Sequence, residues 1–116
     1  MKEFYEQLGL DYSEVLGRLG NDGIIRKFAI KFLSDTNFQD LKEGLEQKDA
    51  EKAFRAAHTL KGICLNLGFS NLYTPSSEIT EKLRGREIKD CDELFAQVQA
   101  EYEKLAEAIK KIAAEG

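Results

Sequence analysis

The sequence of 116 residues has no tryptophan, one proline, two cysteines and one histidine. It also has no continuous apolar run long enough to cross a membrane or to form the core of a signal peptide, so we expect a cytoplasmic protein. Two cysteines and one histidine are too few for a structural zinc site, which takes four such ligands. Cys64 and Cys91 are expected to stay reduced, because disulfides are rare in the cytoplasm.

Charge and composition narrow the range of partners. Acidic residues outnumber basic ones, 21 against 17, which gives a net charge of -4 and an isoelectric point near 5.1. Nucleic acids and anionic membranes require a basic surface, so we expect neither as a partner. A composition of 42% apolar and 33% charged residues is typical of a globular protein, and the length suits a single domain over residues 1–116.

The C-terminal half carries the clearest helical periodicity. Apolar residues recur at steps of three and four at Phe95, Val98, Tyr102, Leu105, Ile109 and Ile112. This spacing predicts a long amphipathic helix that begins near Asp90 or Asp92, either of which could cap it. A shorter stripe precedes it, at Leu72, Ser76, Ile79 and Leu83. That stripe predicts a helix ending by Gly85, in which Pro75 either kinks the first turn or marks a late start.

The segment DGIIRKFAIKFLSDTNFQDLKEGLEQKD, residues 22–49, is helical in pattern but less regular. We expect one long helix, with or without a kink. The alternative is a break at residues 34–37, where Ser, Asp and Asn compete for backbone hydrogen bonds. Phe28 and Phe32 fall outside the apolar stripe of this segment, which consists of Ile30, Leu33, Phe38, Leu41 and Leu45. We expect the short amphipathic segment over residues 1–19 to cover these two rings.

Short connections between long helices predict the fold. They fall at residues 48–50, 68–71 and 85–90, and connections this short join antiparallel neighbours. We therefore expect an all-α protein, an antiparallel up-and-down four-helix bundle over about residues 20–114 with a short N-terminal helical extension over residues 1–19.

The predicted helix over residues 50–67 carries the histidine. At about 100° per residue, its core side consists of Ala53, Ala56, Ala57, Leu60, Ile63, Cys64 and Leu67. His58 points to the opposite side. Close to it in angle are Gly62, Leu65 and Phe69, with Phe54 one turn before and Arg55 and Lys61 on either flank. Apolar residues on an outer face ringed by charge are typical of a docking site, so we assign partner binding to Phe54, Arg55, Leu65 and Phe69.

A single outward histidine most often has no function, but two neighbours favour one here. Gly62 costs about 1 kcal/mol relative to alanine in mid-helix, and it leaves open space beside His58. Lys61 lies three residues on and can reach a group attached to the imidazole. No Ser or Cys triad accompanies the histidine. Covalent catalysis remains, because a neutral imidazole can accept a phosphoryl group and release it again when a partner supplies the metal.

The stretch AHTLKGICLNLGF, residues 57–69, resembles the signature of the histidine-containing phosphotransfer family of two-component phosphorelays. The matching positions are His58, Leu60, Lys61, Gly62, Leu67 and Gly68. A looser match extends over most of residues 20–86. The resemblance implies a four-helix bundle in which His58 carries the phosphoryl group, Lys61 lies near the phosphate and Gly62 leaves room for the partner.

The resemblance also implies the partners. These are receiver domains of response regulators and a hybrid sensor histidine kinase, with Mg²⁺ on the receiver and no cofactor or metal on this chain, which is expected to be a monomer. Two positions depart from the family pattern. Leu65 adds bulk where small residues are common, and Thr80, followed by Glu81, stands where many members carry Glu.

We therefore expect a phosphorelay intermediate in which His58 accepts a phosphoryl group from one receiver aspartate and passes it to another. One alternative is the phosphoacceptor domain of a chemotaxis-type histidine kinase. Another is a non-catalytic helical scaffold that binds receivers without using His58. The chain has no nucleotide-binding motif, so we expect a phosphocarrier without kinase activity of its own rather than an enzyme.

Overall fold

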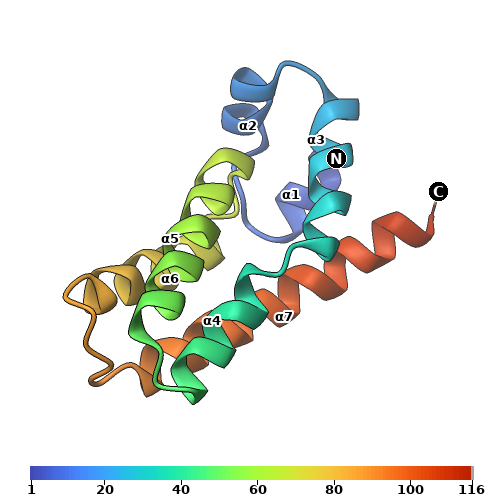
Figure 1. Ribbon diagram of the computed structural model, residues 1–116. Helices are drawn as coiled ribbons and strands as arrows, with labels where there is room; N and C mark the ends of the chain where they lie inside the picture. Colours follow the sequence, from blue (N-terminus) through green and yellow to red (C-terminus); the bar gives the residue numbers. More distant parts are fainter. Residues whose placement is uncertain (116) are drawn as a thin grey trace.

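The structure, a computed structural model, describes residues 1–115 and is all-helical (Figure 1). In chain order the helices are α1 (Lys2–Gln7), α2 (Tyr12–Leu19), α3 (Asp22–Lys31), the 3-10 turn η1 (Phe32–Ser34), α4 (Asn37–Glu46), α5 (Ala50–Leu67), α6 (Ser70–Leu83) and α7 (Asp92–Ala114). No strand occurs in the part of the chain that the structure describes. None of the helices within residues 1–115 is both long and apolar enough to span a bilayer.

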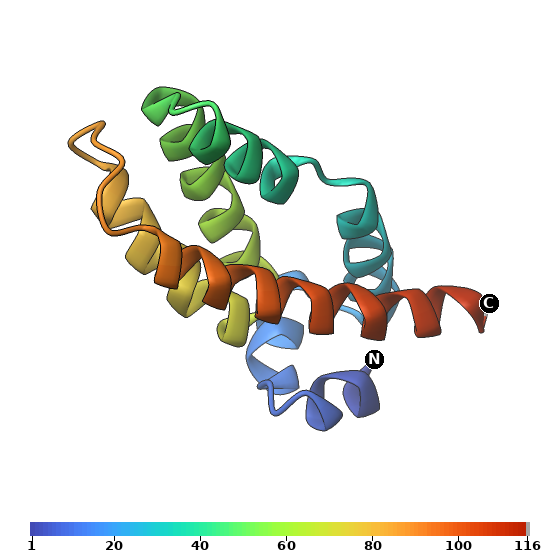
Figure 2. The same ribbon diagram turned by 90° about the horizontal axis from the view of Figure 1, so that it is seen from below.

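Helix α5 lies between α4 and α6, and α6 packs against α7. Helix α7 also contacts α3 and α4, so it runs along much of the molecule and joins its two ends (Figure 2). Each of these helices contributes buried apolar side chains to a common core, among them Ile25, Leu41, Leu60, Ile79 and Ile109. Because α5 has a neighbour on both sides and the core beneath, only its outer side faces solvent.

Helices α4 and α5 approach each other closely at Gly44. A Cβ atom added there would lie 2.7 Å from the backbone nitrogen and 2.9 Å from the Cα of Ala53, which is itself fully buried. Beside this contact, Lys52 and Glu43 form an ion pair of 3.1 Å across the two helices. The pairing of a glycine with an alanine therefore sets how near the two helices can lie.

The expectation of one long helix over residues 22–49 is wrong, and the alternative break is what the structure shows. Helix α3 ends at Lys31, and after η1 the backbone is extended at Asp35. The Asp35 carboxylate accepts hydrogen bonds from the backbone and side-chain nitrogens of Asn37, at 3.0 and 2.8 Å. These side-chain bonds compete with the helical backbone pattern, and they separate α3 from α4.

The N-terminal helices α1 and α2 pack against the end of α5. The Tyr5 hydroxyl donates a 2.5 Å hydrogen bond to the Leu67 carbonyl, and Arg18 donates to the carbonyls of Leu65 and Asn66. Burial raises the pKa of Tyr5. Three consecutive carbonyls in the last turn of α5 are thus bound by side chains from residues 1–19.

This N-terminal segment does not cover both phenylalanines of α3 and η1, as the sequence analysis expected. Phe32 is buried against the rings of Phe69 and Tyr102. Phe28, however, stays 41% exposed, although α2 contacts both α3 and α5. The prediction is therefore wrong for Phe28, and the rings that pack on Phe32 belong to residues outside the 1–19 segment.

Helix α7 begins at Asp92, as predicted, but its capping residue and the start of α6 differ from the expectation. Helix α6 starts at Ser70, so Pro75 lies inside it rather than at a late start. Helix α7 is preceded by Cys91, whose side chain makes no capping hydrogen bond, so neither Asp90 nor Asp92 is the capping residue. Both Cys91 and Cys64 are free thiols and are buried.

Candidate functional site

Helix α5 has the bounds that the sequence predicts, because signals at both of its ends are local. At its start, the Asp49 carboxylate accepts a 3.1 Å hydrogen bond from the Lys52 backbone nitrogen. At its end, Gly68 adopts the left-handed conformation, with φ of 70°, which glycine reaches without a steric penalty. The side of α5 that the pattern assigns to the core is buried at Ala53, Ala56, Ala57, Leu60, Cys64 and Leu67.

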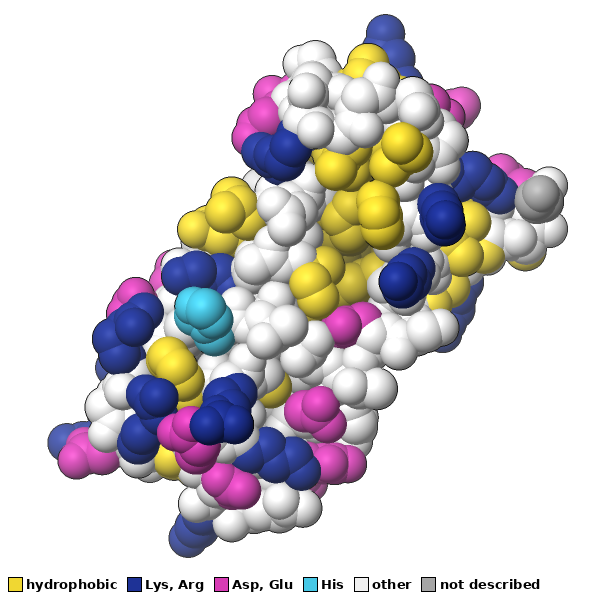
Figure 3. Space-filling view, turned by 45° about the horizontal axis from the view of Figure 1, so that its top comes forward, with side chains coloured by type: hydrophobic (Ala, Val, Ile, Leu, Met, Phe, Trp, Pro, Cys, Tyr) yellow, Lys and Arg dark blue, Asp and Glu magenta, His cyan; other side chains and the backbone are white. Residues whose placement is uncertain are grey.

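His58 lies on the outer side of α5 and is exposed (Figure 3). Its imidazole stacks on the ring of Phe54, one turn earlier, with the two centroids 5.8 Å apart and the planes at 26°. A Cβ added to Gly62 would meet no atom within 4 Å. The imidazole therefore stands on an open surface, and the glycine in the next turn leaves the space beside it unfilled.

Charged groups surround this surface, and most of them are paired. Arg55 is exposed and forms a 2.7 Å ion pair with Glu51. Glu51 also binds Arg86, from the connection between α6 and α7. The hydrogen bond from Arg86, followed by the one from Arg55, holds the pKa of the Glu51 carboxyl below its usual range. Arg55 and Arg86 are therefore bridged by one carboxylate at the edge of the His58 face.

The end of α6 brings a second carboxylate toward His58. Glu81 accepts two hydrogen bonds from Arg84, at 2.7 and 3.0 Å. These bonds lower the pKa of Glu81, and the nearby charge of Lys61 adds to the effect. Thr80 is instead buried, and its hydroxyl donates to the Ser76 carbonyl at 2.6 Å. The acidic group at this end of α6 is therefore Glu81, one residue after the buried Thr80.

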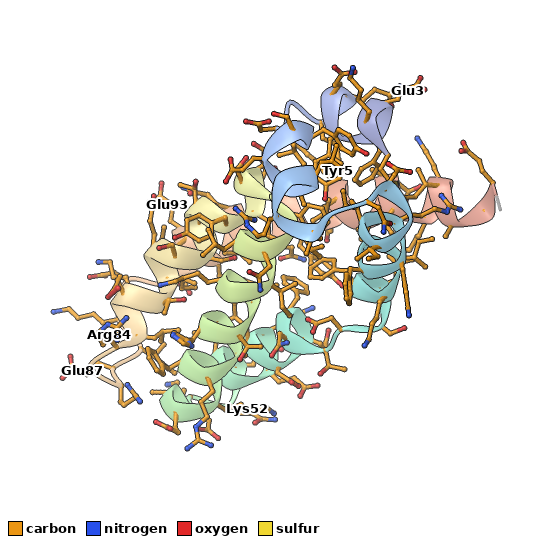
Figure 4. All side chains as sticks on the ribbon, turned by 90° about the horizontal axis from the view of Figure 1, so that it is seen from above. Glu3, Tyr5, Lys52, Arg84, Glu87 and Glu93 are labelled. Atoms are coloured by element: carbon orange, nitrogen blue, oxygen red, sulfur yellow. The ribbon has the colours of Figure 1, made fainter. Side chains whose placement is uncertain are left out.

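Arg84 and Arg86 were not predicted from the sequence as neighbours of Phe54, the residue on which His58 stacks. Both guanidinium groups lie near the Phe54 ring, at 5.6 and 3.8 Å from its centroid. Figure 4 shows Arg84 at the end of the molecule opposite Tyr5, where α6 meets its connection to α7. The sequence shows that the connection between α6 and α7 contains basic residues. It does not show that this connection packs against α5.

The assignment of Phe69 to the docking surface is wrong. Its ring is 1% exposed and contacts the rings of Tyr5 and Phe32. Helix α5 ends at Leu67 and the chain turns at Gly68, so a helical projection no longer applies one residue later. Phe69 is a core residue that anchors the start of α6.

Exposed apolar side chains mark a larger surface on the same face. Leu65 on α5 is 51% exposed, and Ile24 and Phe28 on α3 are 38% and 41% exposed. Between α3 and α5 lies a cavity of about 680 Å³, lined by Arg18, Leu19, Phe28, Lys31, Phe32, Ser34, Asp35, Thr36, Ile63, Asn66 and Leu67. Figure 3 shows this apolar hollow and the histidine on one face, with basic side chains at the rim of the hollow. We call it the α3–α5 groove.

Within residues 1–115, no group of three or more His, Cys, Asp or Glu side chains is arranged to hold a metal ion. The candidate site is the exposed His58, with Lys61 and the open position Gly62 in the next turn of α5.

Fold and site together define a helical domain in which a long amphipathic helix buries one side and exposes a histidine on the other. The sequence model of the Hpt domain family matches residues 33–108, and the chain belongs to this family. The match begins within η1, ends within α7, and contains His58, Lys61 and Gly62. Membership places the chain in histidine phosphotransfer of two-component signalling. No solved structure matches the chain.

Proposed function

We propose that this protein is a phosphorelay intermediate, which accepts a phosphoryl group on His58 from a receiver-domain aspartate and passes it to a second receiver. The observation that carries the proposal is the open imidazole of His58, beside the unfilled space at Gly62. Its place within the matched family region supports it. A histidine with a purely structural role would be buried and hydrogen-bonded instead.

In the proposed reaction a nitrogen lone pair of the neutral imidazole attacks the phosphorus of the aspartyl phosphate. The N–P bond forms as the P–O bond to the aspartate breaks, and the bonding electrons return to the receiver carboxylate. Lys61 would donate a charge-assisted hydrogen bond to the phosphoryl oxygens during transfer. The receiver would hold Mg²⁺, so this chain needs no metal or cofactor of its own.

The receiver would dock over His58 and extend into the α3–α5 groove. Receiver domains gather acidic residues around their aspartate, as the family resemblance implies, and Arg55 and Lys61 offer positive charge beside the histidine. Arg18 and Lys31 line the groove. Leu65 and Phe28 would supply apolar contact area between these charges. Partner recognition would therefore rest on a local basic and apolar face, despite the net charge of -4.

Helices α4 to α7 would form the antiparallel four-helix bundle of the family. Short connections join α4 to α5 and α5 to α6, and each successive pair of helices packs together. Helix α7 contacts α4 as well, which supports closure of the bundle. Helix α3 and the N-terminal helices would then be additions at one end.

The proposal is tested by mixing the purified protein with receiver domains phosphorylated by a small-molecule donor. Acid-labile phosphate should appear on this protein while it disappears from the receiver, and it should return to a second, unphosphorylated receiver. If phosphate arrives only from ATP and a kinase catalytic domain, the chemotaxis-type alternative is correct. Binding of receivers without any transfer would identify a scaffold.

Substitutions at Gly62 separate steric access from helix stability. Gly62→Ala should leave the melting temperature unchanged or raise it, because a Cβ meets open space there and alanine is favoured in helices by about 1 kcal/mol. Gly62→Gln should also fold normally but slow transfer about tenfold or more, since a long side chain would occupy the approach to His58. Rapid-quench transfer and thermal melting measure the two effects. Transfer by Gly62→Gln at the wild-type rate would contradict the steric role.

The extension of the docking surface into the α3–α5 groove predicts a binding defect far from the histidine. Phe28→Ser should raise the dissociation constant for the receiver about fivefold or more, because apolar contacts of this kind contribute about 1 kcal/mol or more. The transfer rate at saturating receiver should not change. Titration calorimetry and single-turnover kinetics measure the two quantities. Lys110→Ser, on the exposed side of α7, is the control, and equal affinities of the two variants would rule out docking at the groove.

A further inference from the structure

Arg86 lies in the connection between α6 and α7 in an unusual backbone conformation. Its φ is 63°, in the left-handed region that residues other than glycine rarely adopt. Its backbone nitrogen donates a 2.8 Å hydrogen bond to the Leu83 carbonyl, which closes a tight turn after α6. Backbone conformations of this kind persist only where surrounding contacts hold them. The contacts of the Arg86 side chain are therefore expected to stabilise this turn.

Three groups hold the Arg86 guanidinium in place. Nε donates to a carboxylate oxygen of Glu51 at 2.5 Å, and Nη1 donates to the Arg84 carbonyl at 2.6 Å. The guanidinium carbon lies 3.8 Å from the centroid of the Phe54 ring, within the range of a cation–π contact. Glu51 and Phe54 both belong to α5, so this side chain ties the connection to the histidine helix.

Phe54 in turn contacts His58. Phe54 is only partly buried, and its ring stacks on the His58 imidazole at 5.8 Å. Phe54 and His58 are four residues apart on α5, where side chains lie one above the other. An exposed imidazole without such a neighbour exchanges between rotamers on the nanosecond timescale or faster. Arg86 restrains the ring against which the imidazole rests.

We propose that Arg86 is a positioning residue for His58 and acts through Phe54. The guanidinium, fixed by Glu51 and the Arg84 carbonyl, holds the phenyl ring, and the ring limits the orientations of the imidazole. In-line transfer requires a defined direction of approach between the nitrogen and phosphorus, so this restraint increases the fraction of complexes that react. The inference rests on the proposed phosphotransfer at His58 and adds a role for a residue outside α5.

The main competing role for Arg86 is direct contact with an acidic receiver. The two roles differ in what they change. Positioning through Phe54 affects the transfer rate within the complex and the orientation of the imidazole in the free protein. Direct docking affects the dissociation constant and its dependence on salt, and it leaves the free imidazole unaltered.

The test compares Arg86→Met, Arg86→Lys and Phe54→Leu in the full chain, with Lys82→Met as the control. Methionine keeps an extended side chain without the charge, and lysine keeps a positive charge without the planar guanidinium group. Leucine at position 54 removes the aromatic ring. Lys82 is exposed near the end of α6, so its variant removes one positive charge without touching Phe54. Melting curves of these four variants and of the double variant with Arg86→Met and Phe54→Leu establish that each one folds.

The first measurement is the NMR signal of the His58 ring protons in the absence of any receiver. Since the chain has one histidine, the signals need no separate assignment. Arg86→Met should shift them toward the values in Phe54→Leu, because the ring-current contribution of a restrained phenyl ring is lost. Arg86→Lys should retain most of the wild-type shift, and Lys82→Met all of it. Unchanged signals in Arg86→Met would overturn the proposal whether or not the protein transfers phosphate.

The second measurement is single-turnover transfer from a saturating phosphorylated receiver. Arg86→Met should slow transfer about three- to tenfold, a modest loss as expected for imprecise orientation, with an unchanged dissociation constant. In the Phe54→Leu background the same substitution should have little further effect, because both residues act on one imidazole. A raised dissociation constant with a normal rate, or additive losses in the double variant, would overturn the positioning role. Absence of transfer by the wild-type protein would instead contradict the proposed function.

Discussion

Replacement of His58 with glutamine is expected to abolish phosphoryl acceptance and leave the fold intact. The imidazole is exposed and stacks on the Phe54 ring, so the free energy of unfolding should change by no more than about 0.5 kcal/mol. Glutamine has no nucleophilic nitrogen, and the variant contains no histidine at all. Phosphate transfer from a labelled receiver should therefore fall to the background rate.

The measurement pairs acid-labile phosphate on this protein with its circular dichroism and melting temperature. Wild-type protein and Gly62→Ala, which keeps the histidine, are the matched controls. Retention of acid-labile phosphate by His58→Gln would mean that another side chain accepts the group. A large loss of helicity would mean that the imidazole contributes to packing, contrary to its exposed position.

Gly44→Ala is expected to give the largest loss of stability among single methyl additions to this protein. The new Cβ would lie 2.7 Å from the nitrogen, 2.9 Å from the Cα and 3.0 Å from the Cβ of Ala53. These are backbone and near-backbone atoms of a buried residue, so relief requires α4 and α5 to move apart. Overpacking of this kind costs about 1–3 kcal/mol, which exceeds the gain of about 1 kcal/mol from helix propensity.

Urea unfolding of Gly44→Ala beside Gly62→Ala separates packing from propensity, because the same chemical change is made twice. At Gly62 the methyl group enters open space and should be neutral or stabilising. At Gly44 the net loss of up to about 2 kcal/mol should lower the melting temperature by up to roughly 10 °C. Equal behaviour of the two variants would show that the helices can separate at little cost.

The sequence predicts α5 and its outward histidine well because the signals are local. Asp49 and Gly68 mark the two ends of the helix, and the apolar repeat between them fixes which side is buried. Within those limits the placement of His58 follows from geometry alone. The error at Phe69 has the same origin, because the projection was carried beyond the residue that ends the helix.

Other features depend on contacts between distant segments and could not be predicted from one sequence. A continuous helix and a helix broken at residues 34–37 satisfy the pattern of residues 22–49 equally well, and packing against α7 and α5 accompanies the break. The position of Arg86 over Phe54 depends on a left-handed residue other than glycine. No local preference indicates such a residue, since its conformation is held by contacts with Glu51.

The bonds from Tyr5 and Arg18 to the carbonyls of Leu65, Asn66 and Leu67 have a consequence for how the molecule opens. The last carbonyls of a helix have no partners within it and carry partial negative charge. Here a phenol and a guanidinium from α1 and α2 supply those partners. Detachment of the N-terminal helices would remove these side-chain partners and leave, among the three carbonyls, the 3.4 Å backbone bond from Gly68 to Leu65, so the first 19 residues and the last turn of α5 should fray together as one cooperative unit.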